Sequence, residues 1–214
     1  MKQNIADLRE SYHSSGLDES KIEKNPIKLF ENWFNYAVKK NILEPNAMTL
    51  ATADEDGKPS ARIVLLKDFD EKGFVFFTNY NSIKGKQLEQ NPNAALVFWW
   101  GALARQIKIE GRVEKVSAEE SDAYFDSRPR GNQLGAVASN QSMLISDYSK
   151  LEKDFAQISE KYKNKKVERP NYWGGYRVKP VMIEFWQGRE NRLHDRLRFT
   201  NYSSQKWKIE RLAP

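Results

Sequence analysis

From Ala47 onward, the sequence is a succession of short β-rich segments separated by turn-forming residues. Two of these segments, residues 48–53 and 60–67, flank the stretch 54–58, whose Asp, Glu, Gly and Lys residues are typical of a hairpin connection. Further strands are expected over residues 74–78, 94–100, 105–116, 176–187, 192–200 and 206–211. Mostly antiparallel strands with helices in their connections indicate an α+β domain built around a β-barrel or strongly curved sheet.

Helices are expected before and between these strands. Asn25-Pro26 is typical of a helix start, and Ser117 to Glu120 has the sequence of a capping box. The remaining helices are predicted over residues 82–90, 131–138 and 149–162. Residues 1–24 are polar and are predicted to form a mobile N-terminal arm, whereas residues 25–214 are predicted to form a single domain.

Composition narrows the classes of function. The chain has 214 residues, of which 39% are hydrophobic, and this is enough for one well-buried domain. It has no cysteine and only two histidines, so we expect no disulfide, no thiolate chemistry and no metal. No apolar run approaches membrane-spanning length, and the N-terminus lacks the apolar core of a signal peptide. We therefore expect a cytoplasmic protein that does not enter a membrane.

The net charge of +6 suits either of two anionic partners, a nucleic acid or a small phosphorylated ligand. The lysine-rich segment 161–166 is the main feature in favour of nucleic acid. It follows a predicted helix beside a proline-containing loop, however, where such runs usually form solvated surface. We therefore expect no nucleic-acid partner. The absence of a Gly-x-Gly-x-x-Gly turn also argues against a dinucleotide-binding Rossmann fold.

Near the C-terminus, the segment Arg192-Leu193-His194-Asp195-Arg196 concentrates charge within a predicted strand. Because strand side chains alternate, Arg192, His194 and Arg196 would share one face at a spacing of about 7 Å. Such groups repel each other unless an anion lies among them. A solvated edge face is the alternative interpretation. The apolar run just upstream, residues 181–186, favours a packed sheet and therefore an anion site.

Two other segments carry cations at strand or helix ends. Arg62 and Lys67 bracket an apolar strand, and their five-residue separation predicts opposite faces, so that one reaches a phosphate and the other a second ligand. Residues 124–130 gather two arginines, a hydroxyl and a phenol at the end of a helix, and arginine forks suit phosphate. The side chains of Gln106, Gln141 and Ser142 are candidates for the neutral hydrogen bonds that read the edge of a heterocycle.

In this order and spacing, the segments resemble the pyridoxine/pyridoxamine 5′-phosphate oxidase family. The resemblance covers nearly the whole chain, from Leu8 to Pro214, and its strongest marks are residues 62–67, 127–130, 141–142, 184–188 and 192–196. It implies an FMN-binding split β-barrel, antiparallel and Greek-key-like with peripheral helices, and a homodimer with FMN at the interface. It also implies oxidation of pyridoxamine and pyridoxine 5′-phosphate to pyridoxal 5′-phosphate, with O₂ as acceptor and release of H₂O₂.

The resemblance assigns individual residues to cofactor and substrate. The positions that match FMN contacts are Arg62, Ile63, Val64, Leu65, Leu66, Lys67, Phe77, Thr78, Lys84, Gln106, Gln141, Ser142, Trp186 and Arg196. The positions that match substrate contacts are Arg9, Tyr12, Lys67, Tyr124, Arg128, Asn132, Arg192 and His194. Arg192 and His194 are the catalytic pair, the first as the principal catalytic side chain and the second as an orienting group. Arg9 and Tyr12 lie in the arm, which is expected to close over the substrate.

Three positions of the predicted domain depart from the family pattern, and the middle of the arm segment 9–12 is altered as well. Ile83 stands where an arginine usually precedes the lysine at Lys84, Asn132 replaces a serine, and Phe77 replaces a frequent tyrosine. The first change removes one expected FMN-phosphate contact, whereas the amide of Asn132 still donates a hydrogen bond. These changes bear on affinity more than on activity.

Two alternatives to this function stay open at the level of sequence. The first is a related split-barrel flavoprotein with another substrate; residues 127–130 and 192–196 count against it, because they are the substrate-side marks. The second is a non-catalytic protein that binds flavin or pyridoxal phosphate, which retention of Arg192 and His194 disfavours.

Overall fold

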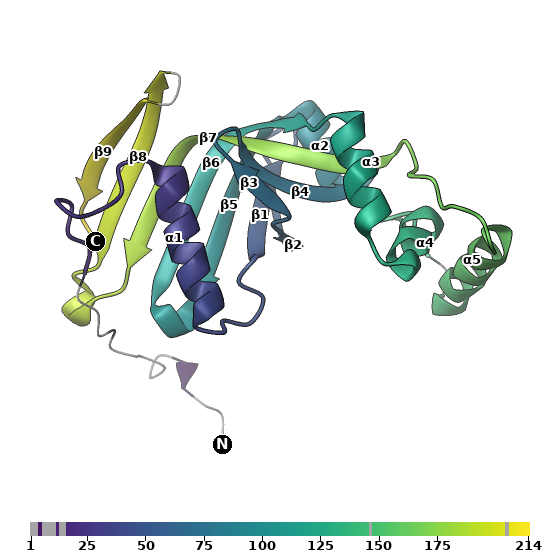
Figure 1. Ribbon diagram of the computed structural model, residues 1–214, viewed down its shortest axis with the longest axis horizontal. Coiled ribbons are helices and arrows are strands. Elements are labelled where there is room, and N and C mark those ends of the chain that lie inside the picture. The colour runs from purple at the N-terminus through teal and green to yellow at the C-terminus, as the bar shows by residue number, and fades with distance from the viewer. Residues whose placement is uncertain (1–3, 6–11, 13–15, 146, 204–205) are drawn as a thin grey trace. The chain divides into compact units, whose positions relative to one another are not determined.

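The computed structural model describes residues 4–5, 12, 16–145, 147–203 and 206–214 (Figure 1). The chain divides into two compact units. Unit 1 comprises residues 1–49, 95–110 and 180–214, and unit 2 comprises residues 50–94 and 111–179. Over the described ranges, every helix is too short or too polar to cross a membrane.

Two of the predicted capping residues begin helices, and the α-helices lie close to their predicted positions. They are α1 (Pro26–Lys39), α2 (Ile83–Gln90), α3 (Ala118–Ser127), α4 (Arg130–Ala138) and α5 (Tyr148–Lys161). The side chain of Asn25 accepts hydrogen bonds from the first backbone N–H groups of α1, and Pro26 occupies a position where its missing N–H costs nothing. Ser117 and Glu120 form the predicted reciprocal capping box of α3.

Nine strands within the described residues form one sheet, in the order β2-β1-β5-β6-β7-β4-β3, with β8 paired to β7 and β9 paired to β8. Their bounds are β1 (Ala47–Ala53), β2 (Pro59–Leu65), β3 (Asp68–Asp70), β4 (Gly73–Asn79), β5 (Asn93–Trp100), β6 (Arg105–Lys115), β7 (Trp173–Gln187), β8 (Asp195–Ser203) and β9 (Lys206–Leu212). The predicted strands are thus confirmed, with differences at some of their ends. The short strand β3 was not predicted, β2 ends at Leu65 rather than at Lys67, β7 begins at Trp173 rather than at Tyr176, and β8 begins at Asp195 rather than at Arg192.

The long strand β7 changes partners along its length. Residues 173–178 pair antiparallel with β4, and residues 182–187 pair antiparallel with β8. Pro180 lies between the two pairings, where its lack of an N–H removes no ladder hydrogen bond to β4 or β8. One strand therefore connects a ladder in unit 2 with a ladder in unit 1.

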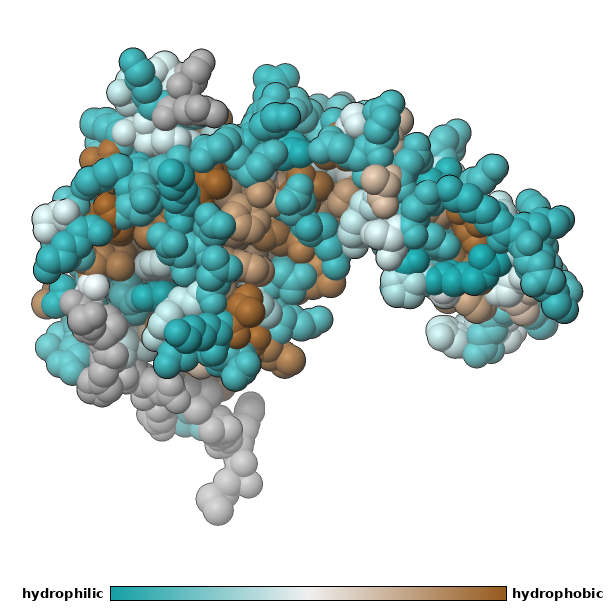
Figure 2. All heavy atoms as spheres, in the orientation of Figure 1, coloured by the Kyte–Doolittle hydropathy of each residue, from teal (hydrophilic) through white to brown (hydrophobic). Residues whose placement is uncertain are grey.

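An aromatic core holds unit 1 together. The apolar face of α1 packs on the sheet through Phe30, whose ring lies 5.2 Å from that of Phe98, and through Trp33, whose ring lies 5.2 Å from that of Phe185. Phe185 in turn contacts Phe199 on β8, with ring centroids 5.5 Å apart. These fully or nearly buried rings fix the facing ends of β7 and β8. On the face drawn in Figure 2, hydrophilic residues cover most of the visible surface.

A second apolar cluster fixes the helices of unit 2. Phe125 of α3, Leu134 of α4, Val167 and Trp173 at the start of β7 pack together and are all buried. The helices α4 and α5 also contact one another. The α3 helix is held further by Arg177, whose buried guanidinium pairs with Glu120 at 2.9 Å and with Asp70 at 2.6 Å. Unit 2 therefore presents the C-terminal end of α3 and the first turn of α4 in a fixed position.

Candidate functional site

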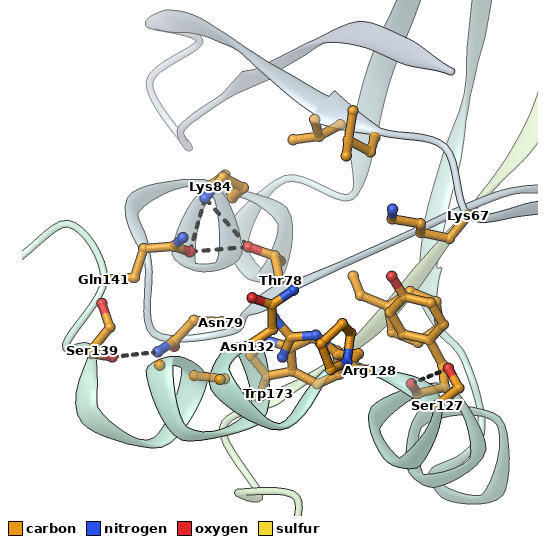
Figure 3. Close-up of a pocket in the computed structure, with 18 of the residues that line it drawn as sticks. Lys67, Thr78, Asn79, Lys84, Ser127, Arg128, Asn132, Ser139, Gln141 and Trp173 are labelled. Carbon is orange, nitrogen blue, oxygen red and sulfur yellow. Dashed lines mark hydrogen bonds between the residues drawn. The ribbon is translucent and has the colours of Figure 1, made fainter. Parts of the chain in front are cut away.

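Unit 2 contains a cavity of about 720 Å³ beside β2, β4, α2 and the junction of α3 with α4 (Figure 3). Its walls bring together twelve residues that the sequence assigned to cofactor or substrate. These are Arg62, Ile63, Val64, Leu65, Lys67, Phe77, Thr78, Lys84, Tyr124, Arg128, Asn132 and Gln141. Residues separated by up to 79 positions in the chain, from Arg62 to Gln141, thus converge on one space.

The cavity is cationic without compensation. Arg62, Lys67, Lys84 and Arg128 line it, and none of the described residues in its wall is acidic. Four like charges around one space raise each other's energy, most strongly where burial reduces screening by water. An anionic ligand relieves this repulsion, so the electrostatics favour an anion, or two, in the cavity.

Lys84 shows the effect of these surroundings most clearly. Its ammonium lies 3.1 Å from Gln141 Oε1 and 3.3 Å from the Thr78 hydroxyl (Figure 3). It also lies 3.3 Å from the Ser82 hydroxyl. These partners are neutral. Burial, followed by repulsion from Arg62, lowers the pKa of Lys84 to about 8. A bound anion beside the Lys84 ammonium would raise this pKa back toward that of an ordinary lysine. A lowered lysine pKa among neutral partners is expected of a buried cation that lacks its anionic partner.

Arg62 is held rigidly in the same part of the cavity. Its guanidinium donates to Thr52 Oγ1 at 2.6 Å and to the hydroxyl of Ser60, and Gln87 Oε1 lies within 3.4 Å. Burial lowers the pKa of Arg62. The prediction that Arg62 and Lys67 point to opposite faces of one strand is wrong, because β2 ends at Leu65 and both side chains line the cavity.

Arg128 lies at the break between α3 and α4. Its guanidinium stacks 4.6 Å above the ring of Trp173, and burial lowers its pKa. The Nη1 atom is buried and has no hydrogen-bond partner in the described part of the chain. Gly131 and Asn132, in the first turn of α4, line the cavity beside it. An unsatisfied donor next to the partially positive end of a helix is suited to a phosphate.

A flat aromatic wall adjoins these cations. The rings of Phe77 and Tyr124 stack with centroids 3.9 Å apart, and the ring of Phe77 stacks on Trp173 at 5.6 Å. Sequence reasoning missed Trp173. The available signal was its position directly before Gly174-Gly175, because paired glycines in a strand indicate close packing of other groups against the backbone. The structure shows this packing, since a Cβ on Gly174 would collide with Tyr80 and a Cβ on Gly175 with Phe77.

A second group of predicted residues lies in unit 1, around Trp186. The ring of His194 lies 4.7 Å from that of Trp186, and Tyr12 contacts both rings at 5.8–5.9 Å. His194 Nδ1 accepts a hydrogen bond from the backbone N–H of Arg189 at 3.1 Å. A neutral imidazole in this arrangement carries its proton on Nε2, which remains the donor toward a ligand.

The prediction that Arg192, His194 and Arg196 share one strand face is wrong. Residues 190–192 form a 3₁₀ turn that is closed by the Leu193 N–H on the Glu190 carbonyl, so β8 begins only at Asp195. Arg192 is exposed and has a left-handed backbone, with φ of +60°. A non-glycine residue in this region costs about 1 kcal/mol or more, and such residues cluster at functional sites.

Arg196 differs from the cavity cations because its charge is compensated. Its guanidinium makes a two-pronged pair with the buried Glu184, at 2.8 and 3.2 Å, and donates to the carbonyl of Ala213 at 3.0 Å. The hydrogen bonds with Glu184 raise the pKa of Arg196. Sequence reasoning missed this role of Glu184, although Glu184 lies two residues before Trp186 on the same strand.

Four further assigned residues lie outside these two groups. Leu66 is buried in the core, Gln106 is half-buried on β6, and Ser142 follows α4 without lining the cavity. Arg9 lies outside the described residues.

Comparison with known proteins places this geometry in a family. Residues 34–162 match the family model described as pyridoxamine 5′-phosphate oxidase, and residues 173–214 match the model of the pyridoxine 5′-phosphate oxidase C-terminal dimerisation region. The pyridoxine/pyridoxamine 5′-phosphate oxidase of Gloeothece citriformis is 59% identical over all 214 residues of both chains. The protein of the same description from Trichormus variabilis is 55% identical over the same span.

The chain belongs to the pyridoxamine 5′-phosphate oxidase family.

Solved structures agree with the fold of this family. PhzG from Burkholderia lata, in complex with tetrahydrophenazine-1-carboxylic acid, superposes with a TM-score of 0.87 at 30% identity, over 94% of this chain and 98% of PhzG. A pyridoxamine 5′-phosphate oxidase-related FMN-binding protein from Nostoc punctiforme superposes with a TM-score of 0.69 at 17% identity, over 86% and 97% of the two chains. The predicted FMN-binding split-barrel fold is thereby confirmed.

Proposed function

We propose that this protein is an FMN-dependent oxidase that converts pyridoxamine and pyridoxine 5′-phosphate to pyridoxal 5′-phosphate with O₂. The observation that supports it most is the cavity of unit 2, where four cations line one space and have no acidic partner among the described lining residues. Their charge suits two phosphate-bearing ligands. The full-length relatives bear the name of this activity. The cytoplasmic location expected from the sequence is part of the proposal.

The residues present suit FMN. Arg62, Lys84, Thr78 and Gln141 would hold its phosphate, because Lys84 has a lowered pKa and only neutral partners among the described residues. Ile83 is exposed and uncharged, so the position of the usual arginine adds no cation to Arg62 and Lys84. When bound, FMN supplies the two-electron redox chemistry and passes the electrons to O₂.

The other cations of the cavity would hold the substrate phosphate. Arg128 has a buried Nη1 without a hydrogen-bond partner among the described residues, and Lys67 and Asn132 line the same cavity. In Figure 3, Lys67 and Ser127 lie on one side of the view and the hydrogen-bonded group of Lys84, Thr78 and Gln141 on the other. Two separated sets of donors fit two phosphates, one on the cofactor and one on the substrate.

Arg192 and His194 would orient the rest of the substrate. Arg192 supplies an exposed fork on a strained turn, and His194 is fixed by the Arg189 backbone so that Nε2 can donate. For the amine, the balanced reaction consumes O₂ and H₂O and yields the aldehyde, ammonia and H₂O₂. Neither side chain needs to be a strong base, because alignment of the breaking C–H bond is the main requirement.

The proposal includes a homodimer with FMN at the subunit interface. The assigned FMN residues separate into a cavity group in unit 2 and a group around Trp186 and Arg196, which lies in the region that matches the dimerisation model. An interface that holds two cofactors should bury about 2,000 Å² or more. Light scattering on the flavin-loaded protein should give twice the chain mass; a monomer with stoichiometric FMN would refute this part.

The decisive test of the activity is turnover of the purified protein. With pyridoxamine 5′-phosphate and O₂, pyridoxal 5′-phosphate and H₂O₂ should form in equal amounts. A flavin absorption spectrum without turnover would favour a non-catalytic binding protein. Flavin reduction only by a carboxylate substrate of the kind bound by PhzG would favour the related-flavoprotein alternative.

A further inference from the structure

The described part of the N-terminal arm is attached to the start of β8 through one carboxylate. Asp195 is nearly buried, and its Oδ2 accepts a hydrogen bond from the backbone N–H of Leu17 at 2.9 Å. Gly16 precedes this contact with φ of +77°, and a Cβ there would lie 2.7 Å from the same oxygen. Only glycine combines this backbone conformation with so close an approach.

Arg211 on β9 completes the attachment. Its Nη1 pairs with Asp195 Oδ1, its Nε pairs with Glu19, and its Nη2 donates to the carbonyl of Leu17 at 3.0 Å. One guanidinium thus joins the arm, β8 and β9, over a sequence separation of more than 190 residues. We call Asp195, Arg211 and Glu19 the arm anchor.

The arm anchor is close in sequence to the point where the arm meets the candidate substrate residues. Leu17 lies five positions after Tyr12, so a fixed Leu17 confines Tyr12 to within about 17 Å. Within that range the Tyr12 ring packs on His194 and Trp186. It also fills the space over Gly188, where a Cβ would lie 2.7 Å from the ring. The surface beneath Tyr12 is therefore shaped to receive it.

Asp195 also contacts the turn that orients His194. The guanidinium of Arg189 lies 3.5 Å from both carboxylate oxygens of Asp195, and the backbone N–H of Arg189 donates to His194 Nδ1. The same carboxylate thus supports the arm on one side and the histidine on the other.

We propose that Asp195 and Arg211 are positioning residues that hold residues 16–19 against β8 and β9, so that the arm anchor sets the fraction of molecules with Tyr12 docked on His194. This rests on the proposed function, since it gives Tyr12 a place over the substrate. A protein whose competent state is only partly populated binds its ligand more weakly by that fraction. Weakening the anchor should therefore act on KM more than on kcat.

A double-mutant cycle in the full-length, FMN-loaded protein tests the coupling. Arg211→Met should raise the KM for pyridoxamine 5′-phosphate about tenfold while kcat changes less than about threefold, because saturating substrate restores docking. In a Tyr12→Ala background the same substitution should add little, since no docked ring is left to lose. Full additivity of the two substitutions would overturn the proposal. Arg211→Lys, which keeps the charge, should recover part of the effect.

Hydrogen exchange tests the anchor without any activity. The peptide that contains Leu17 should exchange more slowly in the parent protein than in Arg211→Met, because Leu17 N–H is held by Asp195. Glu210→Gln is the matched control, since Glu210 pairs with Arg198 across the same two strands and does not touch the arm. Should Arg211→Met fold poorly, Glu19→Gln removes only the exposed end of the anchor. Unchanged exchange of this peptide in both anchor variants would refute the anchor, even if turnover itself is absent.

Discussion

In unit 2, Lys84 and Arg128 face a cavity without an acidic partner among the described residues, whereas in unit 1 Arg196 and Arg211 pair with the buried carboxylates of Glu184 and Asp195. Burial lowers the pKa of the first two side chains, and carboxylate partners raise the pKa of the other two. A buried cation without an anionic partner lowers the stability of the fold. A buried cation that is paired with a carboxylate destabilises the fold only when the pair is broken. The contrast separates cations whose charge is available to an anionic ligand from cations whose charge is already neutralised within the fold.

The largest expected effect concerns the fold. In Arg196→Met, the buried carboxylate of Glu184 keeps one cationic partner among the described residues. This partner is the Lys108 ammonium, 3.8 Å from Glu184 Oε2. Breaking such a pair should lower the free energy of unfolding of FMN-free protein by about 3 kcal/mol. Urea denaturation measures it. Arg198→Met is the control: Arg198 pairs with the more exposed Glu210, so its loss should cost about 1 kcal/mol or less. Equal losses of unfolding free energy in Arg196→Met and Arg198→Met would contradict this prediction.

The second effect concerns chemistry. Arg192→Met should lower turnover about 10²-fold, because a small misplacement of the reacting atoms is enough for such a loss. FMN content and the dimer should survive, since Arg192 is exposed and lies in a turn. His194→Asn should have a milder effect, since an amide preserves one hydrogen bond. Anaerobic stopped-flow measurement of flavin reduction isolates this step. Parental reduction rates in both variants would remove the two residues from the catalytic assignment.

The third effect sharpens the assignment of the cavity. Arg128→Ala should weaken binding of pyridoxamine 5′-phosphate about thirtyfold, or about 2 kcal/mol, through loss of a charge-assisted phosphate contact. FMN content should hardly change. Arg130→Ala, in the same motif, is the control, since Arg130 donates to the Tyr162 carbonyl and does not line the cavity. Loss of flavin from Arg128→Ala would show that this arginine binds FMN rather than the substrate.

The smallest effect is the uptake of a proton by Lys84 when FMN binds. At pH 9 the Lys84 ammonium, with its pKa of about 8, is mostly deprotonated in FMN-free protein, and a bound phosphate should raise that pKa and take up close to one proton. Because the unfolded chain holds this proton up to about pH 10.4, Lys84 makes FMN-free protein more stable as pH rises from 8 toward 10.4. Calorimetry of FMN binding in two buffers of different ionisation enthalpy measures the uptake. Lys84→Met should show none.

Local features of the fold were predictable from sequence because their causes are local. The capping box of Ser117 and Glu120 and the start of α1 at Pro26 lie where the sequence predicts them. The start of β8 was not predictable in the same way, because the left-handed turn at Asn191 and Arg192 interrupts an otherwise strand-like pattern. Alternation alone carries no information about such a turn.

The candidate site was predictable only where motif residues themselves form the walls. Arg62, Lys84 and Arg128 belong to motifs and do converge on one cavity. The partners that decide the role of each cation were not predictable. Glu184 pairs with Arg196 because β7 and β8 are neighbours, and Asp195 meets Leu17 across 178 residues. Such pairings depend on tertiary contacts that periodicity does not specify.

The most direct test of the central comparison is the affinity ratio between FMN and riboflavin, which lacks the phosphate, for FMN-free protein. Calorimetric titration should give a large ratio for the parent, a ratio reduced at least tenfold for Lys84→Met, and a ratio close to the parental one for Arg196→Met. This result would mean that the uncompensated cation binds the phosphate and the compensated one supports the fold. A parental ratio in Lys84→Met, or a collapsed ratio in Arg196→Met, would contradict the account.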